Sequence, residues 1–146
     1  VRRGAPHPDV STPQALKAAL LAADAIYFPD AVRSTAGIHF AGVMRELGVH
    51  DRLEPRFRTF PNGATAMREL AANEMPRLIG CTQVTEIRYT DGVELVAPLP
   101  ARFELATVYT AAVSATAVEP ALAARFIAML AGADARALRE AGGFEP

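Results

Sequence analysis

The sequence predicts an α/β fold of three layers: a mostly parallel sheet flanked by helices, followed by a long crossover strand and C-terminal helices. Two observations support this prediction. Short apolar runs of strand length alternate with segments whose apolar residues recur at helical spacing, and several of these helical segments begin directly after a strand. The 146 residues, of which 51% are hydrophobic, are enough for one domain with a buried core.

The first three elements have clear boundary signals. A helix is expected over residues 12–23, because capping residues and a proline stand at its start. The apolar run 25–28 is typical of a buried strand, and a Pro-Asp pair ends it. A second helix is expected to begin near Thr35 and to close at Gly48, with its apolar residues on one face.

Two further strand and helix units follow along the chain. Residues 56–60 alternate apolar and polar side chains, and a Pro-Asn-Gly turn separates them from a helix over 64–73. Residues 78–82 are predicted to form a strand, 83–88 a short helix or turn, and 93–97 another strand entered through an Asp-Gly turn.

The C-terminal third differs in pattern from what precedes it. Residues 103–114 form a long run that favours β structure, and helices are expected over 119–130 and 134–141. Prolines just before this run mark a boundary. We therefore expect a ligand-binding lobe over 1–100, and a crossover strand with C-terminal helices over 101–146.

Composition excludes several classes of function. The formal net charge is −1 and Lys17 is the only lysine, so the chain lacks the basic clusters that bind nucleic acid. No apolar stretch approaches the roughly 20 residues that span a bilayer. The single cysteine, Cys81, has no companion at metal-ligand spacing, and no metal or cofactor is expected. The chain opens at Val1 without a signal peptide, so any targeting segment is expected upstream.

Three of the expected helices begin at the carboxyl ends of strands, where open parallel sheets usually bind ligands. The start of a helix offers unpaired N–H groups and a partial positive charge, and small residues there let a ligand approach the backbone. We therefore expect a cradle for a small oxyanion. The candidate ligand-binding residues are Ser34, Thr35, Ala36, Gly63, Ala64 and Gln83.

The same residues also have a purely structural interpretation. Ser34 and Thr35 are ordinary helix-capping residues, and Gly63 is an ordinary turn residue. Arg33 can supply a charged donor to an anion, but it is equally typical of a solvated surface charge. The residue pattern by itself leaves both interpretations open.

No set of catalytic residues is apparent in the sequence. His39 has no neighbouring His, Cys or Asp in the sequence and is expected to be a structural histidine. Cys81 lies in an apolar strand and is expected to be a small core residue, not a nucleophile. We therefore expect that the protein is not an enzyme.

Almost the whole chain resembles the second lobe and C-terminal portion of molybdate-type solute-binding proteins of ABC transporters, which have the type 2 periplasmic binding protein fold. The resemblance rests on several phrases that keep the same order. They are residues 1–9, the Ala19-Leu20-Leu21-Ala22-Ala23 run, Thr35-Ala36-Gly37-Ile38-His39, Gly80-Cys81-Thr82-Gln83, residues 92–100 and Gly142-Gly143-Phe144.

Membership of that family implies an anion held in a cleft between two lobes by backbone N–H groups and hydroxyls. Carried over by position, the contacts of the second lobe fall at Ala36, at Gly63 or Ala64, and at Gln83. Gln83 stands where well-studied molybdate binders have a tyrosine. The family's first lobe has no counterpart in this sequence.

The resemblance implies a periplasmic component of an ABC transporter that delivers a small oxyanion, or a related small anionic solute, to a permease. The alternative is an effector-binding domain of a transcriptional regulator with the same fold. Because the first lobe is absent from this sequence, we expect exposed apolar faces on the C-terminal helices. A homodimer, or a dimer that exchanges its C-terminal segments, is expected to cover them.

Overall fold

The computed structural model describes residues 1–144. These residues divide into two compact units, of which the first ends at Leu105 and the second begins at Ala106. The division falls slightly later than the predicted boundary after residue 100. The reason is that the short 3-10 helix η2 (Ala101–Phe103) belongs to the first unit. Phe103 is buried there, and its carbonyl oxygen accepts a hydrogen bond of 2.7 Å from His39 Nε2.

The first unit is built on a parallel sheet of three strands in the order β2-β1-β3. The strands are β1 (Ala25–Pro29), β2 (Phe57–Phe60) and β3 (Leu78–Gly80). In register, Pro29 of β1 lies opposite Phe60 of β2, and Tyr27 lies opposite Gly80 of β3. Helices flank this sheet, which confirms the predicted α/β fold class.

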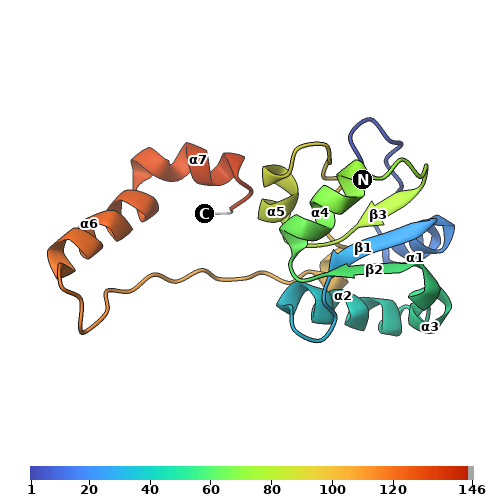
Figure 1. Cartoon of the computed structure of the whole chain (residues 1–146), viewed down its shortest axis with the longest axis horizontal. Helices are drawn as coiled ribbons and strands as arrows, with labels where there is room; N and C mark the ends of the chain where they lie inside the picture. Colours follow the sequence, from blue (N-terminus) through green and yellow to red (C-terminus); the bar gives the residue numbers. More distant parts are fainter. Residues whose placement is uncertain (145–146) are drawn as a thin grey trace. The chain divides into compact units, whose positions relative to one another are not determined.

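The core lies on both faces of the central strand β1, whose five residues are all buried. Because side chains alternate along a strand, Ile26 and Phe28 point to one face, and Ala25 and Tyr27 to the other. The first pair packs in a cluster with residues of the helices over 13–22, 35–46 and 50–53 (α1, α2 and α3). The second pair packs with residues of the helices over 63–72 and 84–89 (α4 and α5). Figure 1 shows α2 and α4 on opposite sides of the sheet.

The helices of this unit follow the sequence prediction closely, with one exception. The exception is the helical turn α3 together with the 3-10 helix η1 (Glu54–Arg56) that follows it, which the sequence did not predict. Both are too short to show an apolar period. The α-helices are α1 (Pro13–Ala22), α2 (Thr35–Glu46), α3 (His50–Leu53), α4 (Gly63–Ala72) and α5 (Val84–Tyr89).

Two predicted strands do not form among the described residues. Residues 104–114 contain no strand, although they are rich in residues that favour β structure. A strand needs a neighbouring backbone to satisfy its N–H and C=O groups, and propensity alone supplies none. The predicted strand over 93–97 is reduced to one antiparallel bridge between Arg2 and Val93.

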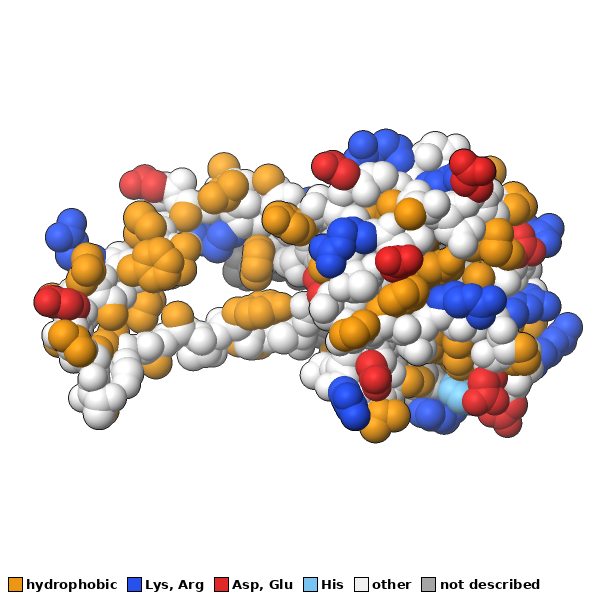
Figure 2. All heavy atoms as spheres, viewed as in Figure 1, with side chains coloured by type: hydrophobic (Ala, Val, Ile, Leu, Met, Phe, Trp, Pro, Cys, Tyr) orange, Lys and Arg blue, Asp and Glu red, His pale blue; other side chains and the backbone are white. Residues whose placement is uncertain are grey.

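The second unit contains α6 (Pro120–Ala131), the 3-10 helix η3 (Ala133–Ala135) and α7 (Arg136–Ala141), which match the two predicted C-terminal helices. Neither α-helix has a buried residue. Leu122, Phe126 and Met129 of α6 are each more than half exposed, at 60%, 55% and 62%. Figure 2 shows apolar side chains along these helices. The exposure of these apolar faces agrees with the expectation from the sequence.

Candidate functional site

The carboxyl edge of the sheet is where the six candidate residues were predicted to lie. Pairing continues just beyond the strands, because the Asp30 N–H donates to the Phe60 carbonyl at 2.7 Å and the Cys81 N–H donates to the Tyr27 carbonyl at 2.9 Å. The parallel strands thus end at one edge. Helix α2 begins after β1, α4 after β2 and α5 after β3, so all three helix starts follow this edge.

The start of α2 is shaped by the turn that links it to β1. Asp30 Oδ1 accepts hydrogen bonds from the N–H groups of Val32 and Arg33, at 2.7 and 2.9 Å. These two bonds lower the pKa of the Asp30 carboxyl group below its usual value. Ser34 is the N-cap of α2, and its side chain makes no capping bond.

The first amide groups of α2 remain open. The N–H groups of Thr35 and Ala36 have no hydrogen-bond acceptor among residues 1–144. Ala36 is partly exposed and Thr35 is exposed, so these groups lie near the surface. They form a pair of donors at the positive end of the helix dipole.

The start of α4 is largely satisfied from within the protein. The Asn62 side chain accepts from the Thr65 N–H at 2.8 Å, and Glu86 Oε1 accepts from the Ala64 N–H at 3.2 Å. Among the described residues, no acceptor is present for the Gly63 N–H. Of the two neighbours proposed from the sequence, the buried Gly63 therefore keeps an N–H without an acceptor, whereas Ala64 does not.

Glu86 joins the starts of α4 and α5, and the sequence analysis missed it. Besides the Ala64 N–H, its carboxylate accepts a short hydrogen bond from the Thr82 hydroxyl. Both side chains fill the space beside Gly63, where a Cβ atom would lie 1.9 Å from Thr82 Oγ1 and 2.0 Å from Glu86 Oε2. The available signal was the position of this acid in the first turn of α5.

Gln83 is the N-cap of α5 and is partly exposed. Its side chain makes no capping bond, while its carbonyl oxygen accepts from the N–H groups of Glu86 and Ile87, at 3.0 and 3.2 Å. The structure therefore places Gln83 at the expected helix start.

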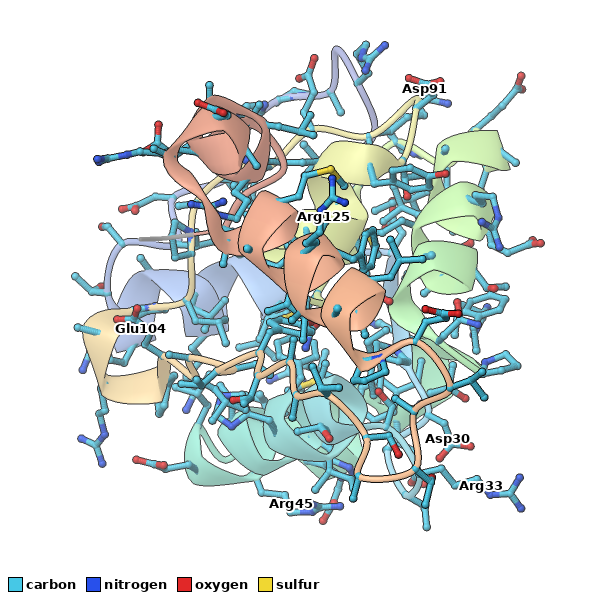
Figure 3. All side chains as sticks on the ribbon, turned by 90° about the vertical axis from the view of Figure 1, so that its left-hand side faces the viewer. Asp30, Arg33, Arg45, Asp91, Glu104 and Arg125 are labelled. Carbon is cyan, nitrogen blue, oxygen red and sulfur yellow. The ribbon has the colours of Figure 1, made fainter. Side chains whose placement is uncertain are left out.

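A hollow of about 220 Å³ lies at the ends of β1 and β2. It is lined by Asp30, Arg33, Thr59, Phe60 and Pro61. Figure 3 shows Asp30 and Arg33 in the same loop, with the Arg33 side chain extending outward. Within residues 1–144, the Arg33 guanidinium forms no hydrogen bond or ion pair.

His39 and Cys81 have the surroundings of structural residues. The His39 ring donates to the Phe103 carbonyl and so fastens η2 to α2. Burial raises the pKa of the Cys81 thiol to about 12, so the thiolate that would act as a nucleophile is scarce at neutral pH. No group of three or more metal-ligating side chains occurs among the described residues.

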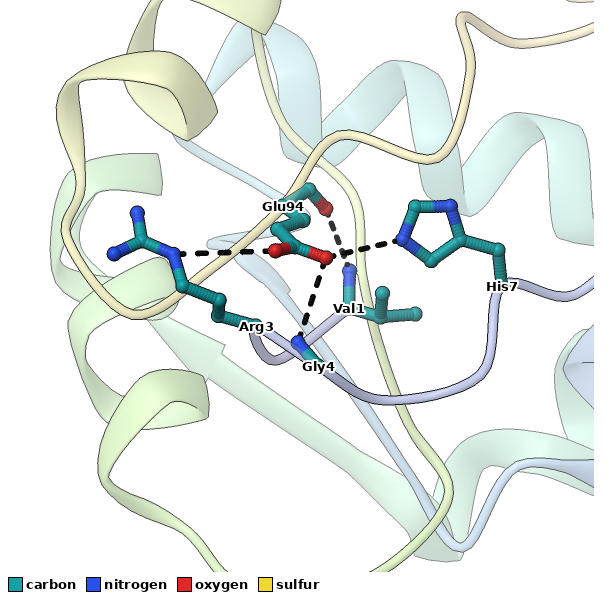
Figure 4. A network of polar contacts seen from close by, with 5 residues as sticks. All are labelled: Val1, Arg3, Gly4, His7 and Glu94. Atoms are coloured by element: carbon teal, nitrogen blue, oxygen red, sulfur yellow. Dashed lines mark hydrogen bonds and ion pairs between the residues drawn. The ribbon is translucent and has the colours of Figure 1, made fainter.

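A second polar cluster fastens the beginning of the chain to the segment after α5 (Figure 4). Glu94 accepts from His7 Nε2 at 3.2 Å and from the Gly4 N–H at 3.4 Å, with Arg3 Nε at 4.0 Å. The His7 and Gly4 hydrogen bonds, with the nearby positive charges, lower the pKa of Glu94. Backbone bonds between Val1 and Glu94 complete the connection, so the cluster has a structural role.

Comparison with known proteins identifies relatives of this chain. The family model described as bacterial extracellular solute-binding protein matches residues 1–145. An aconitate isomerase from Pseudomonas sp. is 25% identical over 153 aligned positions, which cover 100% of this chain and 54% of that protein. The chain thus spans about half the length of this curated relative. Among residues 1–144, no helix has both the length and the apolar character needed to cross a membrane.

These matches bear on two expectations from the sequence. The family match supports an extracytoplasmic protein that binds a solute. The expectation that the protein is not an enzyme is contradicted, because a relative that matches the entire chain is an isomerase. Nucleophile and metal-ligand spacings are the catalytic signals that a residue pattern offers, and they do not reveal an activity that uses other groups.

Proposed function

Since the chain belongs to the bacterial extracellular solute-binding proteins, we propose that it forms a solute-binding lobe that holds a small anion at the carboxyl edge of its sheet. The observation that carries this proposal is the set of open amide donors. The N–H groups of Thr35 and Ala36 in α2, and of Gly63 in α4, have no acceptor among the described residues. Unpaired N–H groups at helix starts attract negative charge.

The other proposed contacts surround these donors. Ser34 carries a hydroxyl that makes no capping bond, and Gln83 stands at the start of α5. Ala64 is proposed to shape the site only through its small side chain, because its N–H donates to Glu86. The absence of a side chain at Gly63 leaves the room that the Thr82 and Glu86 side chains occupy.

The proposed biological role is delivery of the solute to an ABC permease from the periplasm. The family match favours this role over an effector-binding domain of a transcriptional regulator, because the family is extracellular. The solute is proposed to be a molybdate-like oxyanion or another small anion, and no nucleic acid is proposed as a partner.

The second unit is proposed to complete the protein by packing against another lobe or another copy of the chain. Its helices expose the apolar residues that such an interface buries. We expect the chain studied by itself to be a dimer in light scattering at micromolar concentration. A monodisperse monomer would count against a homodimer or an exchange of C-terminal segments.

Isomerisation of a small carboxylate is a second candidate function. It is favoured by the match of the whole chain to an aconitate isomerase. The test is incubation of the protein with cis-aconitate or trans-aconitate, followed by proton NMR. Interconversion of cis-aconitate and trans-aconitate faster than in buffer would support this function. An unchanged spectrum would refute it.

Calorimetric titration with molybdate, tungstate, sulfate, succinate and citrate tests the binding function. Thr35→Pro is the matched probe, because it deletes one open N–H, and the extended backbone of Ser34 (φ −98°, ψ 130°) accepts a following proline. Thr35→Ala is its control, since it removes the hydroxyl and keeps the N–H. We expect Thr35→Pro to weaken anion binding more than Thr35→Ala does; equal effects would refute a role for this amide.

A further inference from the structure

The hollow at the ends of β1 and β2 combines a positive charge with an apolar wall. Its lining includes Arg33, which carries a guanidinium, Thr59, which carries a hydroxyl, and the apolar residues Phe60 and Pro61. Backbone amides by themselves suit any small anion. The side chains of this hollow distinguish one class of anion from another.

The charge of Arg33 is available to a ligand. Its guanidinium has no hydrogen bond or ion pair among the described residues. The nearby Asp30 carboxylate is held by the N–H groups of Val32 and Arg33, so it fixes the backbone of the loop and forms no salt bridge with the guanidinium. A guanidinium presents parallel N–H donors that match the two oxygens of a carboxylate.

The apolar wall is held in place by the core. Phe60 is partly exposed and stacks on the buried ring of Tyr27, with ring centroids 5.8 Å apart and an angle of 10° between the planes. Pro61 beside it is exposed. An inorganic oxyanion has no carbon surface to bury against Phe60 and Pro61, whereas the carbon skeleton of an organic acid does.

Asp30 adds a further restriction. Its carboxylate lines the hollow and remains charged, which repels an anion of high charge density. When one carboxylate group of an organic acid pairs with Arg33, the guanidinium offsets its charge. The rest of the organic acid includes a carbon skeleton. The hollow therefore fits an anion with a carbon skeleton better than an inorganic oxyanion.

We propose that this hollow selects small organic carboxylates, with Arg33 pairing the carboxylate and Phe60 and Pro61 covering the carbon skeleton. This inference rests on the proposed anion-binding function and specifies its solute class. It assigns the charged contact to a side chain outside the set of backbone donors.

The test is calorimetric titration of the protein with citrate, succinate and molybdate. The variant is Arg33→Gln. The control is Arg45→Gln, an exposed arginine in the last turn of α2, the helix that follows the loop of Arg33. We expect Arg33→Gln to weaken carboxylate binding about 10- to 100-fold. We expect Arg45→Gln to bind as the unmodified protein does. Because both arginines are exposed, the urea midpoint should stay unchanged in both variants.

The outcomes separate this inference from the function on which it rests. Equal effects of Arg33→Gln and Arg45→Gln on citrate and succinate overturn the role of Arg33. Binding of molybdate without binding of either carboxylate overturns the proposed solute class and leaves the anion-binding function intact. Absence of binding for all three anions overturns both.

Discussion

Gly37 is the position where a single methyl group should disturb the candidate site most directly. A Cβ atom there would lie 2.2 Å from the Pro29 carbonyl oxygen and 2.3 Å from the Asp30 carbonyl oxygen. Both atoms belong to the backbone at the end of β1, so no side-chain rotation relieves the overlap. Helix α2 must then move away from the strand by about 1 Å, and such overpacking typically costs about 1–3 kcal/mol.

Gly42 of the same helix provides the matched control. It is exposed, and a Cβ atom built there meets nothing within 4 Å. Replacing a helical glycine with alanine stabilises the folded protein by about 0.5–1 kcal/mol when no clash occurs. Both substitutions gain this propensity contribution, so the difference between them isolates the steric cost at Gly37.

Urea unfolding followed by circular dichroism measures this difference. We expect Gly42→Ala to raise the free energy of unfolding. The free energy of unfolding of Gly37→Ala should lie about 1–3 kcal/mol or more below that of Gly42→Ala. Equal stabilities of the two variants would refute the close contact between α2 and the end of β1. The position of the Thr35 and Ala36 amides depends on that contact.

Three further predictions concern contacts around the sheet. Glu86→Ala should lower the free energy of unfolding by about 1–3 kcal/mol, because the partly buried start of α4 loses an acceptor. Glu86→Gln should lower it less, and urea unfolding checks both variants. Arg56 donates to two carbonyl groups at the end of α1, at 2.9 and 2.8 Å. Arg56→Ala should therefore lower the free energy of unfolding by about 2 kcal/mol. Arg52 is exposed, and Arg52→Ala should change this free energy by no more than about 0.5 kcal/mol. With a thiol pKa of about 12, Cys81 should resist iodoacetamide at pH 8 in the folded protein and react after unfolding in urea. Rapid alkylation without urea would contradict the raised pKa of this thiol.

The pKa of Cys81 also fixes the sign of a pH effect. The pKa of about 12 in the folded protein lies above the ordinary thiol value of 9.0. The stability that the neutral thiol contributes is therefore fully present below about pH 9 and is lost as the pH rises toward 12. Replacing Cys81 with alanine should reduce this alkaline loss of stability in denaturation curves.

Local sequence signals predicted the elements that position the site. The helix starts near Thr35 and Gly63 were found because capping and turn residues act within a few positions of the chain. The buried strand β1 was found because it is a short apolar run ended by a turn. These signals need no knowledge of distant residues.

Contacts between distant residues could not be predicted in this way. The bond from the Ala64 N–H to Glu86 joins residues 22 positions apart, and it decides which amide of α4 stays open. The strand expected over 103–114 failed for a related reason, since a strand depends on a partner that propensity does not supply.

The most direct test of the account is to locate the bound anion by amide chemical shifts. In a titration of isotope-labelled protein with citrate, we expect the largest and saturable shifts at the N–H groups of Thr35, Ala36 and Gly63. Saturable shifts confined to other surfaces, such as the Glu94 cluster, would contradict the proposal that the carboxyl edge of the sheet binds the solute.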